Sequence, residues 1–122
     1  MKNPQKIHTP ITARICEKLS AGDRVLLSGS IITGRDTAHK RLAQLIAEGK
    51  DLPVKLDGET IFYAAPTPPR PGRVIGSIGP TTSYRMDEYA PILMAAGIRG
   101  MIGKGSRSPA VRDAIVRYRA VY

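Results

Sequence analysis

The sequence predicts one α/β domain over residues 1–122. Short apolar runs with strand character alternate along the chain with segments whose apolar residues recur every three or four positions. Such alternation is typical of a sheet whose parallel strands are joined by helices. A content of 42% hydrophobic and 24% charged residues is ordinary for a folded domain, and 122 residues are enough to bury a core.

The first quarter of the chain is predicted to form a helix and one or two strands. Isoleucine and leucine residues at a four-residue spacing predict a helix over 11–19. The apolar run that follows predicts a buried strand over 24–28, continued or followed by a short one at 31–32.

A second helix is expected to begin at Asp36 or Thr37, because both are good N-terminal caps, and to end at Gly49. Its apolar face is formed by Ala38, Leu42, Leu45 and Ile46.

The middle of the chain is predicted to contain a turn at 57–58 and a strand over 60–64. Four prolines between Pro66 and Pro71 then predict a stiff, extended loop rather than a linker between domains.

The last third is predicted to hold two more helices around a strand. A helical stretch begins near Tyr84, and Pro91 must kink it or restart it. A short strand is expected over 98–102. Ser108-Pro109 then starts the final helix, because it combines a cap with proline at the first helical position. The last three residues have the character of an opening strand.

Several protein classes are excluded at this point. Cys16 is the single cysteine, so the chain supplies neither a disulfide framework nor several thiolates for an iron–sulfur or zinc site, and we expect no metal ligands in it. The longest nearly apolar run, 90–98, is far shorter than the ~20 residues of a membrane span. The N-terminus lacks the apolar region of a secretory signal. We therefore expect a cytoplasmic protein.

The charge balance is strongly basic, with 19 Lys and Arg against 10 Asp and Glu and a net charge of +9. Such an excess attracts anions, whether nucleic acid, an anionic small molecule or an acidic partner subunit. One Phe, five Tyr and no Trp provide few aromatic platforms for stacked bases. Nucleic acid is therefore the less favoured of these ligands.

Polar side chains gather first in the segment 33–40, between a predicted strand and a predicted helix. Anions bind at such places in open α/β folds because the helix N-terminus offers unpaired N–H groups. Arg35 adds a planar fork that matches a carboxylate. In the alternative interpretation, Asp36 only caps the helix and Arg35 faces water.

Two further segments have similar chemistry. Three adjacent hydroxyls, Thr81 to Ser83, come before Arg85, which follows Thr81 by about one helical turn. This arrangement suits an oxyanion or a carboxylate as well as a simple helix cap. The third segment, Gly103-Lys104-Gly105, combines close backbone approach with a mobile positive charge. It matches neither a P-loop nor a dinucleotide-binding glycine pattern.

Three strings occur in a fixed order: LSGSIITGRDTAHKR at 27–41, IGPTTSYRMD at 78–87 and MIGKG at 101–105. Together with YAAPTPPRPG at 63–72, they resemble the β subunit, or C-terminal domain, of the iron–sulfur hydro-lyases. These are the class I fumarate hydratases and the L-tartrate dehydratases. The resemblance covers nearly the whole chain.

This resemblance implies a fold, an activity and a partner. The fold is a swivelling β/β/α domain of three layers. The activity is reversible hydration of fumarate to malate by a hydro-lyase of which this chain is the β subunit, inactive alone. A [4Fe–4S] cluster is held by three cysteines of a separate α subunit, with which this chain forms a hetero-oligomer. L-Tartrate dehydratase is the alternative within the family.

The resemblance also implies roles for single residues. Arg35, Arg85 and Lys104 match substrate-binding positions for the carboxylates of the dicarboxylate substrate. Thr81 matches the catalytic base for the C3 proton, activated by an aspartate of the other subunit. A supporting role is implied for Asp36, His39 and Thr82.

Some features depart from the family pattern. Ala65 replaces an expected glycine, and Tyr84 stands where a smaller residue is common, so that it narrows or reshapes the pocket. The family's β domains run on past the point equivalent to Tyr122, so we expect a short or truncated member. A function of another class also stays open: a stand-alone basic module that binds nucleic acid or an acidic protein.

Overall fold

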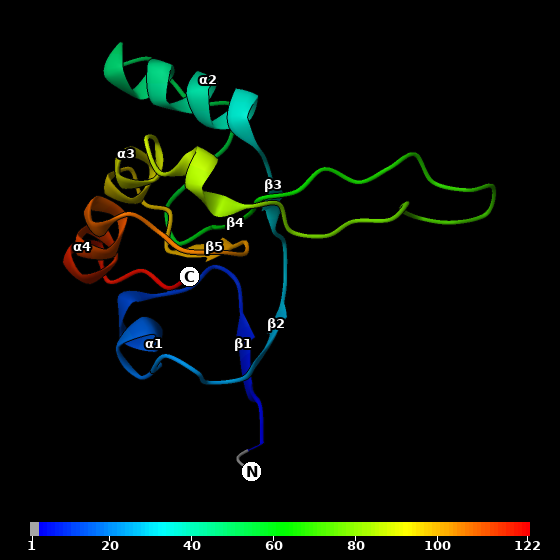
Figure 1. Ribbon diagram of the computed structural model, residues 1–122, viewed down its shortest axis with the longest axis horizontal. Coiled ribbons are helices and arrows are strands. Elements are labelled where there is room, and N and C mark those ends of the chain that lie inside the picture. Colours follow the sequence, from blue (N-terminus) through cyan, green and yellow to red (C-terminus); the bar gives the residue numbers. More distant parts are fainter. Residues whose placement is uncertain (1–2) are drawn as a thin grey trace.

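Parallel strand pairing organises the fold. The structure is a computed structural model that describes residues 3–122, so Met1 and Lys2 of the expected domain lie outside the described residues. Within that range the strands form one three-stranded and one two-stranded sheet, and every pairing between them is parallel. The predicted α/β class is therefore confirmed (Figure 1).

The three-stranded sheet lies at the centre of the larger part of the molecule. Its strands are β3 (Ile32–Thr33), β4 (Thr60–Phe62) and β5 (Gly100–Ile102), in the order β3-β4-β5. Ile32 is in register with Ile61, and Ile61 with Met101. The three strands therefore run side by side in one direction, and their carboxyl ends meet at one edge.

The smaller sheet pairs β1 (Gln5–His8) with β2 (Val25–Ser28), and α1 (Ala13–Glu17) connects them. Helix α1 is shorter than the predicted 11–19, because Thr12 caps it by accepting the Ile15 N–H at 3.2 Å. The prediction of a buried strand over 24–28 was wrong in one respect. Val25 and Leu26 are 42% and 56% exposed, since β2 pairs with β1 alone.

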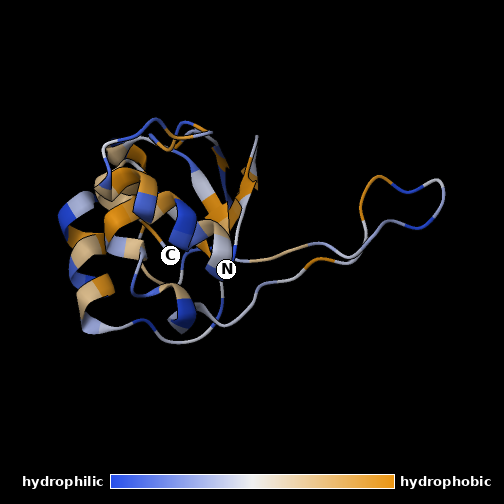
Figure 2. Cartoon of the chain, turned by 90° about the horizontal axis from the view of Figure 1, so that it is seen from above, coloured by the Kyte–Doolittle hydropathy of each residue, from blue (hydrophilic) through white to orange (hydrophobic). Residues whose placement is uncertain are grey.

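Four helical segments pack beside the larger sheet. They are α2 (Asp36–Ala47), the single 3₁₀ turn η1 (Ser83–Met86), α3 (Ala90–Ala95) and α4 (Pro109–Tyr118). Helix α3 contacts both α2 and α4, and α2 also contacts η1. Figure 2 shows the apolar sides of these elements turned toward one another. The main core includes the fully buried Ile61, Tyr63, Met86, Leu93, Ile98 and Val111.

Local signals fixed the helix starts well in the last third of the chain. Ser108 caps α4 by accepting the Val111 N–H at 3.3 Å, and Pro109 is its first residue, as predicted. Pro91 stands in the first turn of α3, so it restarts the helical stretch rather than kinking it. Val121 forms a parallel bridge with Gly100, in agreement with the strand character of the chain's last residues.

A long arm, residues 65–80, leaves the body after β4 and returns before η1 (Figure 1). It contains the four prolines that predicted a stiff loop, and it extends far from both sheets. Among the helices of residues 3–122, none has the length and apolarity that would carry it across a bilayer.

Candidate functional site

The carboxyl ends of β3 and β5 lead directly into two of the polar segments singled out in the sequence. β4 leads into the arm, whose return brings the hydroxyl segment back to the Tyr63 carbonyl. Arg35 follows β3, Tyr63 and Ala64 follow β4, and Lys104 follows β5. In open parallel sheets this edge is where ligands bind, because the loops that diverge there leave room between them. The topology therefore brings the three segments to one edge.

A hollow of about 440 Å³ lies at this edge, between the start of α2 and the root of the arm. Arg35 and Arg85 both line it, together with Asp36, Ala64 and Pro66. Arg85 reaches it from η1, more than forty positions away in the sequence. Two arginines from separate motifs thus line one cavity.

Asp36 is the acidic member of this cavity. Its Oδ2 lies 3.9 Å from Nη1 of Arg85, and both side chains are 56% exposed. An exposed pair of this length is weak, worth about 0–1 kcal/mol. The carboxylate also sits in the first turn of α2, where the helix dipole favours negative charge. Arg85 therefore remains available to an anion that brings a better geometry.

The predicted cap of α2 was wrong. Arg35 is the N-cap residue, and neither Asp36 nor Thr37 caps the helix, because no side chain accepts a capping hydrogen bond there. The alternative in which Asp36 serves only as a cap is therefore contradicted. The first residues of α2, whose N–H groups have no partner within the helix, line the same hollow as Arg35.

His39 supports Arg35 from inside the core. Its side chain is fully buried, and Nδ1 lies 2.9 Å from the carbonyl oxygen of Arg35. A carbonyl only accepts, so Nδ1 carries the proton. The ring meets Tyr63 edge-on, with centroids 5.1 Å apart. Burial lowers the pKa of His39, the Arg107 charge lowers it further, and the bond to Arg35 opposes both effects.

The hydroxyl segment is fastened to the ends of β4 and β5 through its backbone. The Thr81 N–H donates to the carbonyl of Tyr63 at 2.8 Å. Thr82 forms a parallel bridge with Lys104, and the Ser83 N–H donates to the Lys104 carbonyl at 2.9 Å. Thr81, Thr82 and Lys104 are consequently neighbours at the same edge.

These three residues do not line the 440 Å³ hollow, and neither does the buried His39. Of the predicted site residues, Arg35, Asp36 and Arg85 line it. Thr81 and Thr82 are half-buried, and Lys104 is exposed. Within residues 3–122, the side chains of Thr81 and Thr82 make no hydrogen bond to the protein, so neither caps η1. The structure therefore brings Arg35, Asp36 and Arg85 into one cavity and holds the other three beside it.

Tyr84, the departure from the family pattern, does not narrow this cavity. It is 63% exposed and is absent from the cavity wall. The third hydroxyl, Ser83, is fully buried, and its Oγ lies 2.7 Å from the Tyr122 hydroxyl. The Tyr122 hydroxyl donates to the Gly105 carbonyl at 3.0 Å, so Ser83 is the donor to Tyr122. Ser83 thus belongs to the scaffold.

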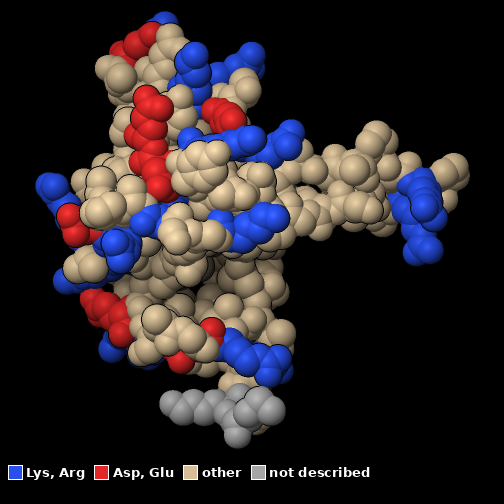
Figure 3. Space-filling model, viewed as in Figure 1, with Lys and Arg blue, Asp and Glu red and all other residues tan. Residues whose placement is uncertain are grey.

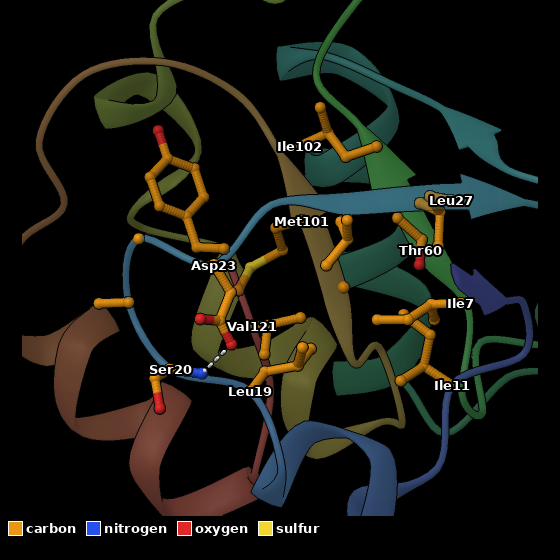
Figure 4. Close-up of a pocket in the computed structure, with 15 residues that line it drawn as sticks. Ile7, Ile11, Leu19, Ser20, Asp23, Leu27, Thr60, Met101, Ile102 and Val121 are labelled. Atoms are coloured by element: carbon orange, nitrogen blue, oxygen red, sulfur yellow. Dashed lines mark hydrogen bonds between the residues drawn. The ribbon is translucent and has the colours of Figure 1, made fainter. Parts of the chain in front are cut away.

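A second cavity, of about 260 Å³, lies between the two sheets (Figure 4). Ile7, Ile11, Leu27, Met101 and Val121 turn their side chains into it. At its rim the Ser20 N–H donates to Asp23 Oδ2 at 2.9 Å. Among residues 3–122, its lining is mostly apolar and contains no Lys, Arg or His to pair with a carboxylate, so the hollow with two arginines is the candidate site.

A sequence profile described as Fumarase C-terminus matches residues 3–122. The chain belongs to this family. It is 43% identical over 100 residues to Fumarate hydratase class I, anaerobic, of Escherichia coli K12, a match that covers 81% of this chain and 18% of that protein. It is 36% identical over 102 residues to Fumarate hydratase 2 of Leishmania major, covering 83% and 18%.

The family also includes separate subunits. The chain is 32% identical over 117 residues to L(+)-tartrate dehydratase subunit beta of Escherichia coli K12, covering 93% of this chain and 57% of that one. The resemblance drawn from the three strings is therefore confirmed. The chain spans less than a fifth of the fumarate hydratases it matches and just over half of the tartrate dehydratase subunit.

The iron–sulfur cluster implied by the family does not fit the residues of this chain. Cluster ligation needs several thiolates, and the single Cys16 is buried in the small core beneath the β1–β2 sheet. Burial raises the pKa of its thiol, which disfavours the thiolate. Residues 3–122 hold no group of three His, Cys, Asp or Glu side chains arranged to bind a metal ion.

An internal ion pair was missed by sequence reasoning. Arg107 is 8% exposed, and its Nε donates to Asp87 Oδ1 at 2.8 Å. Its Nη2 donates to the Tyr63 hydroxyl at 3.1 Å, and its guanidinium lies 4.6 Å from the centre of the Tyr122 ring. Asp87 Oδ2 accepts the Ser108 N–H at 2.8 Å.

This pair fastens the segment after β5 to the end of η1. One signal in the sequence pointed to it: residues 61–122 contain only three acidic side chains, one of which, Asp87, ends the second string. A buried arginine in this half of the chain has few carboxylates nearby in sequence with which to form an ion pair. Nothing in the sequence showed which arginine is buried.

Proposed function

We propose that this chain is the β component of an iron–sulfur hydro-lyase that reversibly adds water to fumarate, forming malate. In this proposal it has the swivelling β/β/α architecture of the family, and an α component supplies the [4Fe–4S] cluster. The observation that carries the proposal is that Arg35 and Arg85, from two separate motifs, line one hollow at the carboxyl edge of a parallel sheet.

The two arginines suit a dicarboxylate. Each guanidinium presents parallel N–H donors that match a carboxylate fork. Lys104 lies at the same edge through the Thr82 bridge and adds a third positive charge. In our proposal Arg35, Arg85 and Lys104 bind and orient the substrate carboxylates.

In this proposal the three cations contribute to catalysis by stabilising negative charge that develops on the substrate. In the direction of dehydration a proton leaves C3 beside a carboxylate, and negative charge builds up on that carboxylate. Fixed cations stabilise this charge more in the transition state than in the ground state, which raises kcat. Thr81 is proposed as the base at C3. A threonine hydroxyl is a weak base, so we assign its activation to a carboxylate of the α component.

Asp36, His39 and Thr82 are proposed as positioning residues. The contact from His39 Nδ1 to the Arg35 carbonyl holds the backbone from which the Arg35 side chain extends. Asp36 faces Arg85, and the Thr82 backbone pairs with Lys104. Each therefore acts on one of the three cations rather than on substrate.

L-Tartrate is the second candidate substrate, and a specific observation favours it. The tartrate dehydratase relative is a separate subunit of which this chain covers 57%, whereas the fumarate hydratases match over 18% of their length. Both substrates carry two carboxylates, so the same cations serve either. The rates at which the enzyme converts fumarate and L-tartrate decide between the two substrates.

The test is an anaerobic hydratase assay. The chain is mixed with its cognate cluster-bearing subunit, and loss of the fumarate double bond is followed by ultraviolet absorbance. L-Tartrate is assayed in parallel through its product. We expect activity in the mixture and none with the chain alone. Arg85→Ala should abolish that activity.

The matched control is Arg112→Glu with Arg117→Glu, two exposed positions on α4. It should retain near-normal kcat/KM. Because Arg85 makes only the 3.9 Å pair with Asp36 among the salt bridges of residues 3–122, Arg85→Ala should keep the thermal midpoint of the wild type. Near-normal turnover by Arg85→Ala would refute the role of the hollow. Turnover of neither substrate by a bound, cluster-loaded mixture would refute the function.

A further inference from the structure

The arm, residues 65–80, carries no part of either core, yet it has a defined shape. It projects from the body in two perpendicular views (Figures 1 and 2). Near its middle the Thr67 N–H donates to the Ser77 carbonyl at 2.9 Å, and the Ser77 N–H donates to Thr67 Oγ1 at 2.8 Å. These two bonds join its outgoing and returning halves.

The tip is a tight turn. In Arg70-Pro71-Gly72-Arg73 the last N–H donates to the first carbonyl at 3.0 Å, and Gly72 has φ +79°. Proline followed by a glycine of positive φ is the pattern of a type II β-turn. The other prolines, at 66, 68 and 69, fix φ along the outgoing half. Little conformational entropy is left to lose when such an arm is bound.

The turn places two cations side by side at the far end. Arg70 and Arg73, the first and fourth residues of the turn, line a hollow of about 480 Å³ together with Ile75. Figure 3 shows them as an isolated basic patch at the end of the arm. Residues 60–86 contain no acidic side chain, so nothing on the arm neutralises them.

Apolar side chains stand beside these cations. Val74 is fully exposed, and Ile75 is 52% exposed. Water contact with such side chains is unfavourable, and burying each against a partner is worth about 1.5–3 kcal/mol. A basic and apolar projection of fixed shape fits a cleft with carboxylates at its rim and an apolar floor.

The roots of the arm are parts of the candidate site. The outgoing root, Ala65 and Pro66, lines the hollow that holds Arg35 and Arg85. The returning root is Pro80 and Thr81, and the Thr81 backbone is tied to Tyr63 at 2.8 Å. The arm therefore connects its distant tip with the cavity and with the proposed base (Figure 1).

We propose that the arm is the docking element with which this chain engages the cluster-bearing component of the hydro-lyase, and that Arg70 and Arg73 pair there with carboxylates. This inference rests on the proposed function. The length of the fumarate hydratase relatives supports the choice of occupant, because more than four-fifths of each lies outside the part that matches this chain.

The experiment compares two charge reversals of equal size. Arg70→Glu with Arg73→Glu changes the arm tip, and Arg112→Glu with Arg117→Glu changes α4. Binding of each purified chain to the cognate cluster-bearing subunit is measured anaerobically by interferometry. We expect the arm variant to bind at least about tenfold more weakly, because two attractive contacts become repulsive. The α4 variant should stay within about twofold of the wild type.

A third variant, Val74→Asp, tests the apolar contact and should also weaken binding. All variants should unfold at the wild-type temperature. Raising salt from about 0.05 to 0.3 M should weaken the wild type and leave the arm variant little changed.

If the arm variant binds the subunit with wild-type affinity, the docking role is overturned. Normal hydration of fumarate by the arm variant mixed with the subunit would then leave the proposed function intact. Equal weakening by the α4 variant would also overturn it, because the effect would then follow net charge. If the wild-type chain does not bind the subunit at all, both proposals fail. Self-association that the arm variant loses, with subunit binding unchanged, would assign the arm to a second copy of this chain and overturn the proposal.

Discussion

Replacing Asp87 with alanine should lower the free energy of unfolding by about 3–5 kcal/mol. The change removes the carboxylate 2.8 Å from Arg107 Nε, whose side chain is 3% exposed. A hydrogen bond to a charged group contributes about 1.5–3 kcal/mol. The Ser108 N–H also loses its acceptor, which adds about 1–3 kcal/mol where water does not replace it.

Denaturation in urea, followed by circular dichroism, measures this loss. A domain of this size has a free energy of unfolding of about 5–15 kcal/mol, so the variant should unfold at a much lower urea concentration. The thermal midpoint should fall by about 10–20 °C. Asp113→Ala, at an exposed carboxylate on α4, is the control and should stay within about 0.5 kcal/mol of the wild type.

A double variant separates the unpaired charge from the lost bond. Arg107→Met added to Asp87→Ala removes the buried guanidinium that has lost its counterion, so it should restore part of the stability. If Asp87→Ala costs less than about 1 kcal/mol, or if the double variant is less stable than the single one, the pair does not fasten these segments.

Three other perturbations test separate parts of the structure. His39 has a lowered pKa, so below about pH 6.5 the unfolded chain binds a proton that the folded chain does not. The free energy of unfolding should therefore decrease as the pH is lowered, by up to about 1.4 kcal/mol per pH unit. His39→Asn should flatten that slope in urea titrations at several pH values, and an unchanged slope would contradict it. Gly103→Ala should cost about 1–3 kcal/mol, because a Cβ there overlaps Ser83 Oγ and lies 2.7 Å from Cδ2 of Tyr63. Gly79→Ala, which meets nothing within 4 Å, is its control, and equal midpoints would refute the clash. Finally, the isolated chain should bind fumarate with a Kd above about 1 mM in calorimetry, and submillimolar binding would contradict the exposed geometry of its arginines.

Local chemistry made the helix starts and the arm predictable from sequence. Ser108-Pro109 carries both its cap and its fixed φ in adjacent residues, and Pro91 required either a kink or a restart, of which the structure has the restart. The prolines at 66–71 likewise stiffen the chain without help from distant contacts. Such signals survive folding because they depend on neighbours in the sequence alone.

The burial of individual side chains was predicted less well, because it depends on which other elements pack against each helix or strand. The apolar run of β2 has the composition of a core strand, but its single neighbour leaves Leu26 56% exposed. On α2 the fully buried face is shifted from the predicted stripe toward His39, Leu42 and Ala43. His39 has a polar side chain, and its contacts with Tyr63 and the Arg35 carbonyl support its burial, although Nε2 has no hydrogen-bond partner among the described residues.

The candidate site was predictable only as a set of separate segments. Arg35 and Lys104 each follow a predicted strand, and strand pairing in the structure brings them to one edge of the sheet. The position of Arg85 depends on where η1 lies, and that follows from the long return of the arm and the Asp87–Arg107 pair. Arg107 differs from the other arginines of its half only in its surroundings, so the sequence did not single it out.

The energetics of the site explain why its cations act weakly in this chain by itself. Arg85 and Asp36 are each 56% exposed, so water screens the field that the guanidinium groups exert on an anion in the hollow. The supports of these groups, His39, Tyr63 and Arg107, are buried and fixed. The chain therefore holds the backbone that carries these cations, while water weakens the interaction of their exposed side chains with an anion. A surface that closes over the hollow would remove that water. An arm rooted at Pro66 and Thr81 is well placed to direct where such a surface lands.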